Sequence, residues 1–325
     1  MTKRFNKSPL WAITTFYDST GNIWRLRNLR AFYHHLNVPL MVVELVGSGG
    51  GQLKSTDADM VVTLTGDSLI WQKERLLNIG IKHLPADVEY VAWIDSDIVF
   101  ENRAWADDAI TLLKSGKQYV QLFESVARLP ELPETSLLDI ESLLNTKPVM
   151  EKPSFAYAVD KDEYFRVDQG DLLAKEHAKT RRGHTYGIVH GIGWASKRQL
   201  HERIGLYDAC IIGGGPTAMA LAAIGRPEQL TAKRPMSTKH NAHYLDWADA
   251  FKGNSRSSIG FVSGRALHLW HGAYENRGYH ERHFVLKEMN FDPVTDLTQA
   301  DNATWQWSPE AVELRVAVKS YFYKR

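Results

Sequence analysis

The first 125 residues alternate between short apolar runs and longer amphipathic segments. The apolar runs are partly β-branched and bounded by turn residues, which predicts strands. The segments between them carry apolar side chains at near-helical spacing, which predicts helices. The predicted strands are residues 10–18, 38–46, 60–66, 89–97 and 119–125, and the predicted helices are residues 22–36, 68–84 and 104–116. This alternation predicts an α/β fold in which a mostly parallel, Rossmann-like sheet is flanked by helices.

The pattern changes between residues 126 and 184. Residues 128–153 are punctuated by proline and carry at most one short helix, and residues 178–184, AKTRRGH, are basic without an apolar face. A connection this long inside a compact domain is usually functional or disordered. We expect an inserted loop that folds over a site, with residues 178–184 as a candidate lid or, equally, as a solvated surface loop.

A second ordered block and a helical tail complete the predicted organisation. The tail sequence SPEAVELRVAVKSYFYKR predicts a helix with Pro309 in its first turn. The predicted regions of the chain are residues 8–125, 126–185, 186–291 and 292–325.

One predicted strand ends in a pair of acids. Residues 89–105, EYVAWIDSDIVFENRAW, run from an almost continuous apolar segment into Asp95 and Asp97. Residues i and i+2 of an extended chain share a face, and open α/β sheets bind ligands at the carboxyl ends of their strands. Two carboxylates so placed repel unless a cation or hydrogen-bond donors compensate them, and Mg²⁺ or Mn²⁺ is suited to this. An ordinary exposed loop is the alternative, because D-x-D alone is common.

Composition sets wider bounds. The chain has 325 residues, of which 44% are hydrophobic and 24% charged, with a formal net charge of +1. These values are typical of a globular protein and give no global field for nucleic acid or anionic lipid. Cys210 is the single cysteine, which excludes an intrachain disulfide and fits a reducing compartment. With no signal-peptide pattern and no long apolar run, we expect a cytoplasmic protein without a membrane span.

Three further segments stand in a meaningful order around the acidic pair. Residues 71–80, WQKERLLNIG, precede it. Residues 190–225 join a glycine-flanked aromatic, a GLYD turn and a triple glycine that leads into a helix. Residues 266–283, ALHLWHGAYENRGYHERH, supply two histidines at HxxH spacing. Over roughly residues 10–290, this order resembles glycosyltransferases of the GT-A fold, above all bacterial and viral sugar transferases with a WQKERLLN helix and an HLWHG segment.

The resemblance implies a role for each matching region and residue. Residues 8–125 would bind the nucleotide sugar, 126–185 would form a lid or acceptor loop, and 186–291 would bind the acceptor. The implied metal ligands, for Mn²⁺ or Mg²⁺, are Asp95, Asp97 and His271, with His268 as a helper. The residues expected at the nucleoside diphosphate sugar, by preference a UDP-sugar, are Thr15, Phe16, Tyr17, Lys73, Arg75, Asp95 and Ser96. Those expected at the sugar or acceptor are Trp194, Gly214, Gly215 and Trp270.

For two pairs of these residues, local geometry argues against a shared role. On a strand, His268 and His271 would face opposite sides, so one of them could simply pack or form a hydrogen bond. Lys73 and Arg75 lie two residues apart on a helix and cannot share one face, so we expect one of them to be an exposed charge.

The glycine-rich turn departs from the resemblance. Many inverting GT-A enzymes carry an acid after this turn that deprotonates the acceptor hydroxyl, whereas this chain has Pro216 and Thr217. Three explanations stay open. Another acid, Asp208 or Glu124, serves as the base; the enzyme retains configuration and needs no such base; or activity is lost. Asp208 is the catalytic candidate kept beside Asp97, and a capping or turn role is its alternative.

The leading hypothesis is a metal-dependent glycosyltransferase, a hexosyltransferase, that moves a sugar to a hydroxyl acceptor such as a surface glycan. One alternative is a phage-type enzyme acting on hydroxymethylated pyrimidines in duplex DNA, with residues 178–184 and 196–203 at phosphates. Another is a non-catalytic protein that binds a nucleotide sugar or glycan, motivated by Pro216. A nucleotidyltransferase lacks a triphosphate-binding signature near residue 18, and a hydrolytic zinc site lacks the glutamate of HExxH.

Overall fold

The computed structural model describes residues 8–17, 22–47, 50–66, 69–168, 187–251, 258–272 and 282–323. The candidate lid, residues 178–184, lies outside these described residues.

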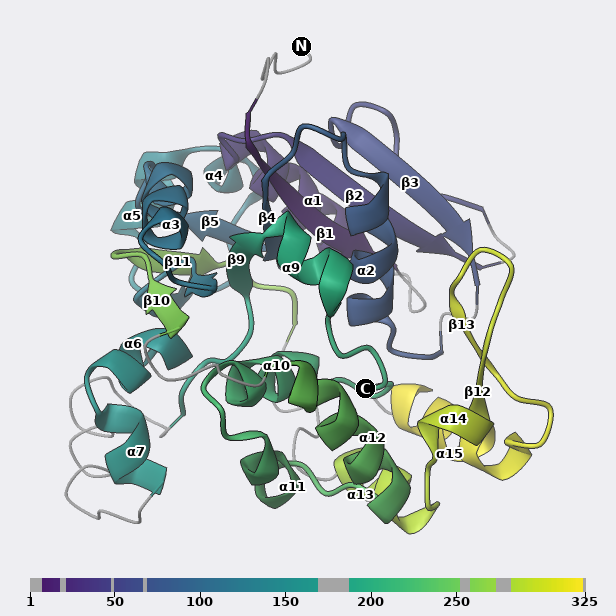
Figure 1. Ribbon diagram of the computed structural model, residues 1–325. Helices are drawn as coiled ribbons and strands as arrows, with labels where there is room; N and C mark the ends of the chain where they lie inside the picture. Colours follow the sequence, from purple (N-terminus) through teal and green to yellow (C-terminus); the bar gives the residue numbers. More distant parts are fainter. Residues whose placement is uncertain are drawn as a thin grey trace.

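A seven-stranded sheet forms the centre of the molecule, in the order β10-β6-β9-β4-β1-β2-β3 (Figure 1). All neighbouring strands pair in parallel except β9, which is antiparallel to both β4 and β6. The expected class, α/β with a mostly parallel sheet flanked by helices, is confirmed. The strands are β1 (Leu10–Phe16), β2 (Leu40–Val46), β3 (Met60–Thr65), β4 (Tyr90–Ile94), β6 (Tyr119–Gln121), β9 (Gly193–Lys197) and β10 (Ile259–Phe261).

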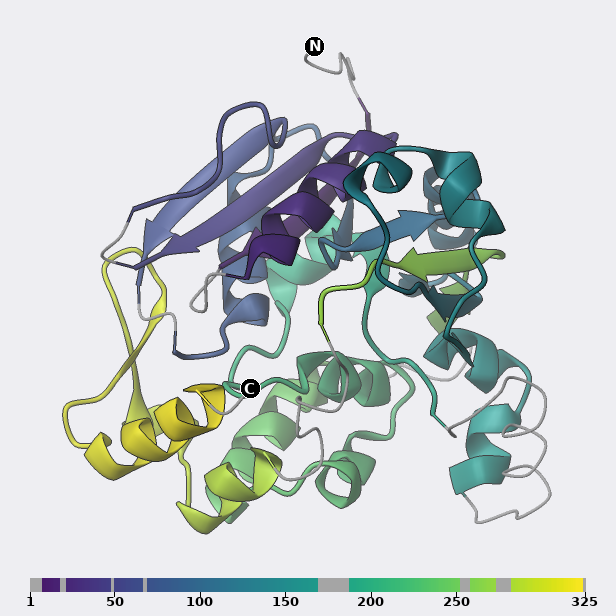
Figure 2. The same cartoon turned by 180° about the vertical axis from the view of Figure 1, so that it is seen from behind.

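Helices cover both faces of this sheet. Helices α1 (Ile23–His35) and α3 (Trp105–Lys114) pack on one face, and α2 (Lys73–His83) packs on the other. Figure 1 shows α2 in front of the strands, and Figure 2, seen from behind, shows the purple helix α1 on the opposite side. Successive strand residues enter the two cores alternately, because side chains on a strand point to opposite faces.

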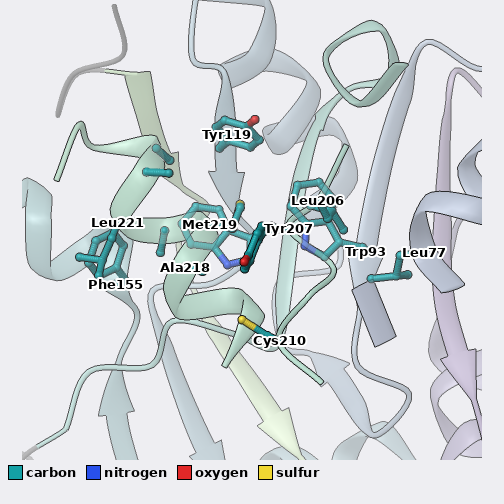
Figure 3. Packing of buried hydrophobic residues seen from close by; sticks show 14 of the residues in the cluster. Leu77, Trp93, Tyr119, Phe155, Leu206, Tyr207, Cys210, Ala218, Met219 and Leu221 are labelled. Carbon is teal, nitrogen blue, oxygen red and sulfur yellow. The ribbon is translucent and has the colours of Figure 1, made fainter. Parts of the chain in front are cut away.

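The core on the α2 side extends beyond the sheet into the second half of the chain. Its side chains come from α2 and β4 and also from the helix α10 (Gly215–Ala223), as Figure 3 shows for Leu77, Trp93 and Met219. Helix α10 lies below the carboxyl ends of the parallel strands in Figure 1. The two ordered blocks predicted from the sequence therefore share one core.

A second, four-stranded sheet has the order β5-β11-β7-β8. Its strands are β5 (Ile98–Phe100), β7 (Ser125–Arg128), β8 (Met150–Pro153) and β11 (Arg265–His268). Strand β11 pairs antiparallel with β5, which places His268 opposite Ile98. This pairing brings a segment from late in the chain beside the acidic turn between β4 and β5.

Residues 119–168 differ from their prediction in two ways. The single strand predicted at 119–125 is divided into β6 and β7, which belong to different sheets. The expectation of at most one short helix in residues 128–153 is wrong, because α4 (Glu134–Leu137), α5 (Ile140–Asn145) and β8 all form there. Leucines 137 and 143 fill a small core shared with β7 and β11, and this burial orders the segment. Helices α6 (Phe155–Asp160) and α7 (Glu163–Asp168) follow.

The part of the chain that follows β9 is mainly helical. Besides α10 it contains α9 (Arg198–Arg203), η1 (Pro227–Gln229), α11 (Leu230–Lys233), α12 (Thr238–Ala248), η2 (Asp249–Phe251), α13 (Arg282–Glu288), α14 (Pro293–Asp296), the hairpin β12 (Leu297–Gln299) and β13 (Trp305–Trp307), and α15 (Val312–Tyr323). The hairpin reaches back to the end of β3, where the Asn302 side chain donates to the Thr65 carbonyl at 2.6 Å (Figure 2). Pro309 precedes α15 instead of lying in its first turn. No helix in the described ranges is long and apolar enough to cross a membrane.

Candidate functional site

Asp97, His268 and His271 converge at the carboxyl edge of the central sheet. The His271 Nε2 atom lies 3.2 Å from Asp97 Oδ2, and His268 Nε2 lies 3.9 Å from the same oxygen. Strand β11 ends at His268, and the Leu269 N–H donates to the Asp97 carbonyl at 2.8 Å. Because the chain leaves the strand there, both histidines face Asp97, whereas a continued strand would have placed them on opposite sides.

The three side chains fit a divalent cation. One carboxylate oxygen and two imidazole nitrogens lie within 4.8 Å of one another, and the Asp97 side chain is 18% exposed. Manganese accepts such oxygen and nitrogen donors, and zinc also binds three protein ligands of this kind. The donor set therefore indicates a metal site and leaves the identity of the metal to experiment.

Asp95 lies beside this cluster but contacts a different partner. Its carboxylate pairs with the Lys73 ammonium at the start of α2, and its backbone N–H donates to the Ile192 carbonyl at 2.7 Å. Burial lowers the pKa of Lys73, but the attraction of nearby carboxylates, Asp95 first, outweighs it, and the net shift is upward. Lys73 therefore carries a positive charge beside the acidic turn. A role for Asp95 as a metal ligand stays a prediction.

Arg75 lies on the other side of the first turn of α2. It pairs with Asp208 at 3.1 Å, donates to the Ala303 carbonyl at 2.6 Å, and stacks on Trp305 with 4.1 Å between the guanidinium carbon and the ring centre. The Lys73 and Arg75 side chains are 14% and 16% exposed. The expectation that one of them is an exposed charge is wrong, because the acidic turn covers one side of the helix start and the C-terminal hairpin covers the other.

The end of β1 is lined by aromatic and cationic groups. Tyr17 meets Trp71 edge to face at 5.6 Å, and the Arg25 guanidinium lies 5.7 Å from the Tyr17 ring centre while donating to the Tyr17 carbonyl. Thr15 is half-buried, whereas Phe16 is 3% exposed and packs in the core. This edge offers an aromatic wall, and its proposed contact with a base or ribose stays a prediction.

Of the residues expected to contact the sugar or the acceptor, some lie in the core and others lie near the metal cluster. Trp194 is 1% exposed, and its indole N–H donates to the His190 carbonyl at 2.7 Å. Trp270, next to His271, packs edge to face on Trp24 at 4.9 Å. Gly214 has φ +109° and caps the N-terminus of α10, a conformation that glycine adopts without strain. Of these residues, Trp194 is a core residue because its side chain is almost fully buried.

Sequence reasoning missed Glu74. It lies between Lys73 and Arg75, is 6% exposed, and contacts the start of α10. A Cβ atom added to Gly215 would lie 2.8 Å from the Glu74 Cγ and closer still to its carboxyl group. The signal in the sequence was weak, because a glutamate in the first turn of a helix is ordinarily explained by the helix dipole.

No family model and no curated protein matches this chain. Its fold aligns loosely with several solved structures. One is the mannosyltransferase PcManGT from Pyrobaculum calidifontis in complex with GDP-Man and Mn²⁺, with 14% identity, 96% of this chain and 69% of that chain covered, and a TM-score of 0.37.

Another is S. aureus TarS 1–349 in complex with UDP, with 12% identity, 66% of this chain and 54% of that chain covered, and a TM-score of 0.34. A third is 4-diphosphocytidyl-2C-methyl-D-erythritol synthase from Anaerococcus prevotii, with 13% identity, 78% and 86% covered, and a TM-score of 0.30. This chain thus spans about half the length of the TarS chain. Because all three TM-scores are low, we base the function on the geometry of this chain's own residues.

Proposed function

We propose that this protein is a metal-dependent glycosyltransferase that moves a sugar from a nucleoside diphosphate sugar, by preference a UDP-sugar, to a hydroxyl acceptor. The observation that carries the proposal is the convergence of Asp97, His268 and His271 on one point at the carboxyl edge of the sheet. A cation held there would stand beside the Lys73 ammonium, at the edge where open α/β sheets bind ligands.

The chemistry of the transfer requires positive charge at this place. When the bond between the sugar and the diphosphate breaks, negative charge develops on the departing phosphate. A bound divalent ion supplies Lewis-acid stabilisation of that charge without a proton transfer. Lys73 adds a fixed positive charge in a partly buried setting, where an electrostatic interaction is stronger than in water. Tyr17 and Trp71 offer aromatic faces for the nucleoside.

A thermal-shift experiment tests metal and nucleotide together. UDP and GDP are each added with Mn²⁺, Mg²⁺, Zn²⁺ or EDTA. We expect one nucleotide to raise the melting temperature only with a divalent ion, since a ligand at about 100 times its Kd stabilises the native state by about 2.7 kcal/mol. Asp97→Asn should lose this response. A response that survives in Asp97→Asn, or no response in the wild type, contradicts the proposal.

Asp57→Asn is the matched control. Asp57 is also a largely buried aspartate paired with a cation, Arg30, at 2.9 Å. Its replacement should lower the melting temperature but keep the response to nucleotide and metal. Release of UDP from UDP-glucose, UDP-galactose or UDP-N-acetylglucosamine then separates an enzyme from a non-catalytic binding protein, which would show the thermal shift without turnover.

The DNA alternative rests on two basic segments, and part of the described one is engaged within the protein. Within residues 196–203, Ser196 and His201 are buried and lie 2.7 Å apart, from Oγ to Nε2. Arg198 pairs with Glu202 at 3.1 Å and donates to the Pro85 carbonyl. Lys197 and Arg203 of the same segment are exposed. We keep a glycan hydroxyl as the proposed acceptor because the net charge of the chain is only +1, which gives no global attraction to DNA.

A further inference from the structure

The transfer reaction needs a group that takes up the acceptor's proton, and the carboxylates at the site are not equivalent. Asp95 is paired with Lys73, and Asp208 is paired with Arg75. The carboxylate of the metal cluster faces two imidazoles. An ion pair or a bound cation occupies the lone pairs of a carboxylate and favours its charged form, which makes it a poor proton acceptor.

Glu74 differs from these three acids because it forms no ion pair with any residue that the structure describes. Its residue is 6% exposed, and its Oε1 atom is buried with no hydrogen-bond partner among the residues that the structure describes. An unpartnered buried oxygen is uncommon in native proteins and calls for an explanation. One explanation is that this oxygen of Glu74 accepts a proton from the substrate.

Glu74 packs against the backbone of a second element, the helix α10. Its carboxyl group lies against the α-carbon of Gly215, in the first turn of α10, and any side chain at that position would displace it. Helix α10 has nine residues, and its N-terminus carries a partial positive charge that an anion stabilises. The Glu74 carboxyl therefore lies at the first turn of α10.

The surroundings of Glu74 bring the pKa of its carboxyl group close to neutral pH. Burial raises the pKa of Glu74 to about 7, against the lowering effect of Lys73, and the charges of Asp95 and Asp208 raise it further. Burial, and then the charge of Glu74, raises the pKa of the Cys210 thiol, which stays neutral. A base whose pKa lies near the working pH can both accept and release a proton in each cycle.

We propose that Glu74 is the proton acceptor of the sugar transfer, an inference that rests on the proposed function. The acceptor oxygen uses an electron pair to bond the anomeric carbon, and its proton passes to Glu74. The bond between that carbon and the diphosphate oxygen breaks, and its electron pair leaves with the diphosphate. Direct displacement of this kind inverts the configuration at the anomeric carbon. Asp208, engaged by Arg75, then serves structure instead of acting as the base.

The test uses water as the acceptor, because hydrolysis requires the same loss of a proton. UDP release from UDP-glucose, UDP-galactose and UDP-N-acetylglucosamine is measured with Mn²⁺ across neutral pH. For the wild type we expect kcat to rise with pH and level off above about 7. Glu74→Gln should lower kcat by about 100-fold or more, with KM unchanged and the pH-dependent rise lost. Glu74→Asp should restore part of kcat and the rise with pH.

Two comparison variants make the test specific. Asp208→Asn should keep the rise of kcat with pH. Glu44→Gln is the matched control, since Glu44 is also buried but its carboxylate accepts from the Gln52 N–H at 2.6 Å and the Leu53 N–H at 3.0 Å. It should keep both kcat and the pH profile.

Each outcome decides for or against the inference. The inference is overturned if Glu74→Gln keeps the wild-type kcat or keeps the rise of kcat with pH. It is also overturned if Glu74→Gln loses the thermal response to UDP and Mn²⁺, because that loss would reveal a structural role for Glu74. Loss of the rise in Asp208→Asn instead overturns it in favour of Asp208. Retention of configuration in the released sugar also overturns it. A wild type with neither metal-dependent nucleotide binding nor UDP release overturns the proposed function, and the inference with it.

Discussion

Replacing Glu74 by glutamine tests the charge of this buried carboxyl in the protein without substrate. Glutamine has nearly the same shape as glutamate but does not titrate, so the comparison isolates one ionisation. Burial is the largest cause that raises the pKa of Glu74 from 4.5 to about 7, and it outweighs the attraction of Lys73. Asp95 and Asp208 raise the pKa further. The variant therefore replaces a group that favours its neutral form by one that is always neutral.

The sign of the effect follows from the protons bound in each state. Between pH 4.5 and about 7 the folded protein holds a proton on Glu74 that the unfolded chain has released. Stability falls with rising pH wherever the folded state binds more protons. One pKa unit corresponds to about 1.36 kcal/mol, so the shift of about 2.5 units predicts that the wild type loses roughly 3 kcal/mol relative to Glu74→Gln between about pH 4.5 and about pH 8.

Urea unfolding at a series of pH values measures this change. The quantity of interest is the difference in unfolding free energy between variant and wild type at each pH. The difference removes titrations that both proteins share. Buried His201 and His240 are examples, because burial lowers their pKa values to about 4 and about 3 and makes stability rise with pH up to about 6.5.

Asp57→Asn is the control for the pH series. Burial alone would raise the pKa of Asp57, but hydrogen bonds from Arg30 and from the Lys54 backbone N–H outweigh burial, and the net shift of this pKa is downward. Its stabilising contribution is complete above pH 3.8 and is lost only as the pH falls further, so the penalty of this variant should be constant from about pH 5 to about pH 8. If the difference for Glu74→Gln is equally constant, Glu74 is ionised in the folded protein and the reasoning is refuted.

Two further substitutions test the packing and the charge of α2. Gly80→Ala should destabilise the protein by about 1–2 kcal/mol in urea unfolding, because the new Cβ would lie 2.5 Å from Val43 Cγ2 and 2.6 Å from Ile13 Cδ1, and this overpacking exceeds the gain in helix propensity. A more stable variant would contradict the close packing of α2 on β1 and β2. Lys73→Met should weaken UDP binding in calorimetry by about 10-fold to 100-fold, the loss of one charged hydrogen bond, while Mn²⁺ binding by the Asp97 cluster persists; equal UDP affinity would remove Lys73 from the diphosphate.

The central sheet was predictable because local burial decides its elements. Strands β1 to β4 and helices α1 to α3 each bury one face or both, so the spacing of apolar residues reveals their type. The same signal failed at residues 119–125. There an apolar run bends from one sheet into the other, and Leu122 and Phe123 are buried in the bend as fully as in a strand. Periodicity shows that a segment is buried but not that it changes sheet.

The site was predictable only as far as its residues lie close together in sequence. Asp97 stood out because it follows an apolar run at the carboxyl end of a predicted strand, where open α/β sheets bind ligands. The joint approach of both histidines depends on the pairing of β11 with β5 and on the end of β11 at His268. Local spacing carries no information about either, and for that reason it placed His268 and His271 on opposite sides.

Glu74 lies beyond local inference for a related reason. In sequence it is a charged residue between Lys73 and Arg75, where an exposed helix start would leave it in water. Three distant segments remove that water: the acidic turn pairs with Lys73, the C-terminal hairpin covers Arg75, and Gly215 meets Glu74 itself. The absence of a side chain at position 215 is as necessary to the arrangement as the carboxyl group, since it lets a buried acid approach the backbone of α10. A glycine and a glutamate far apart in the chain therefore define one feature, and only the folded structure shows that they meet.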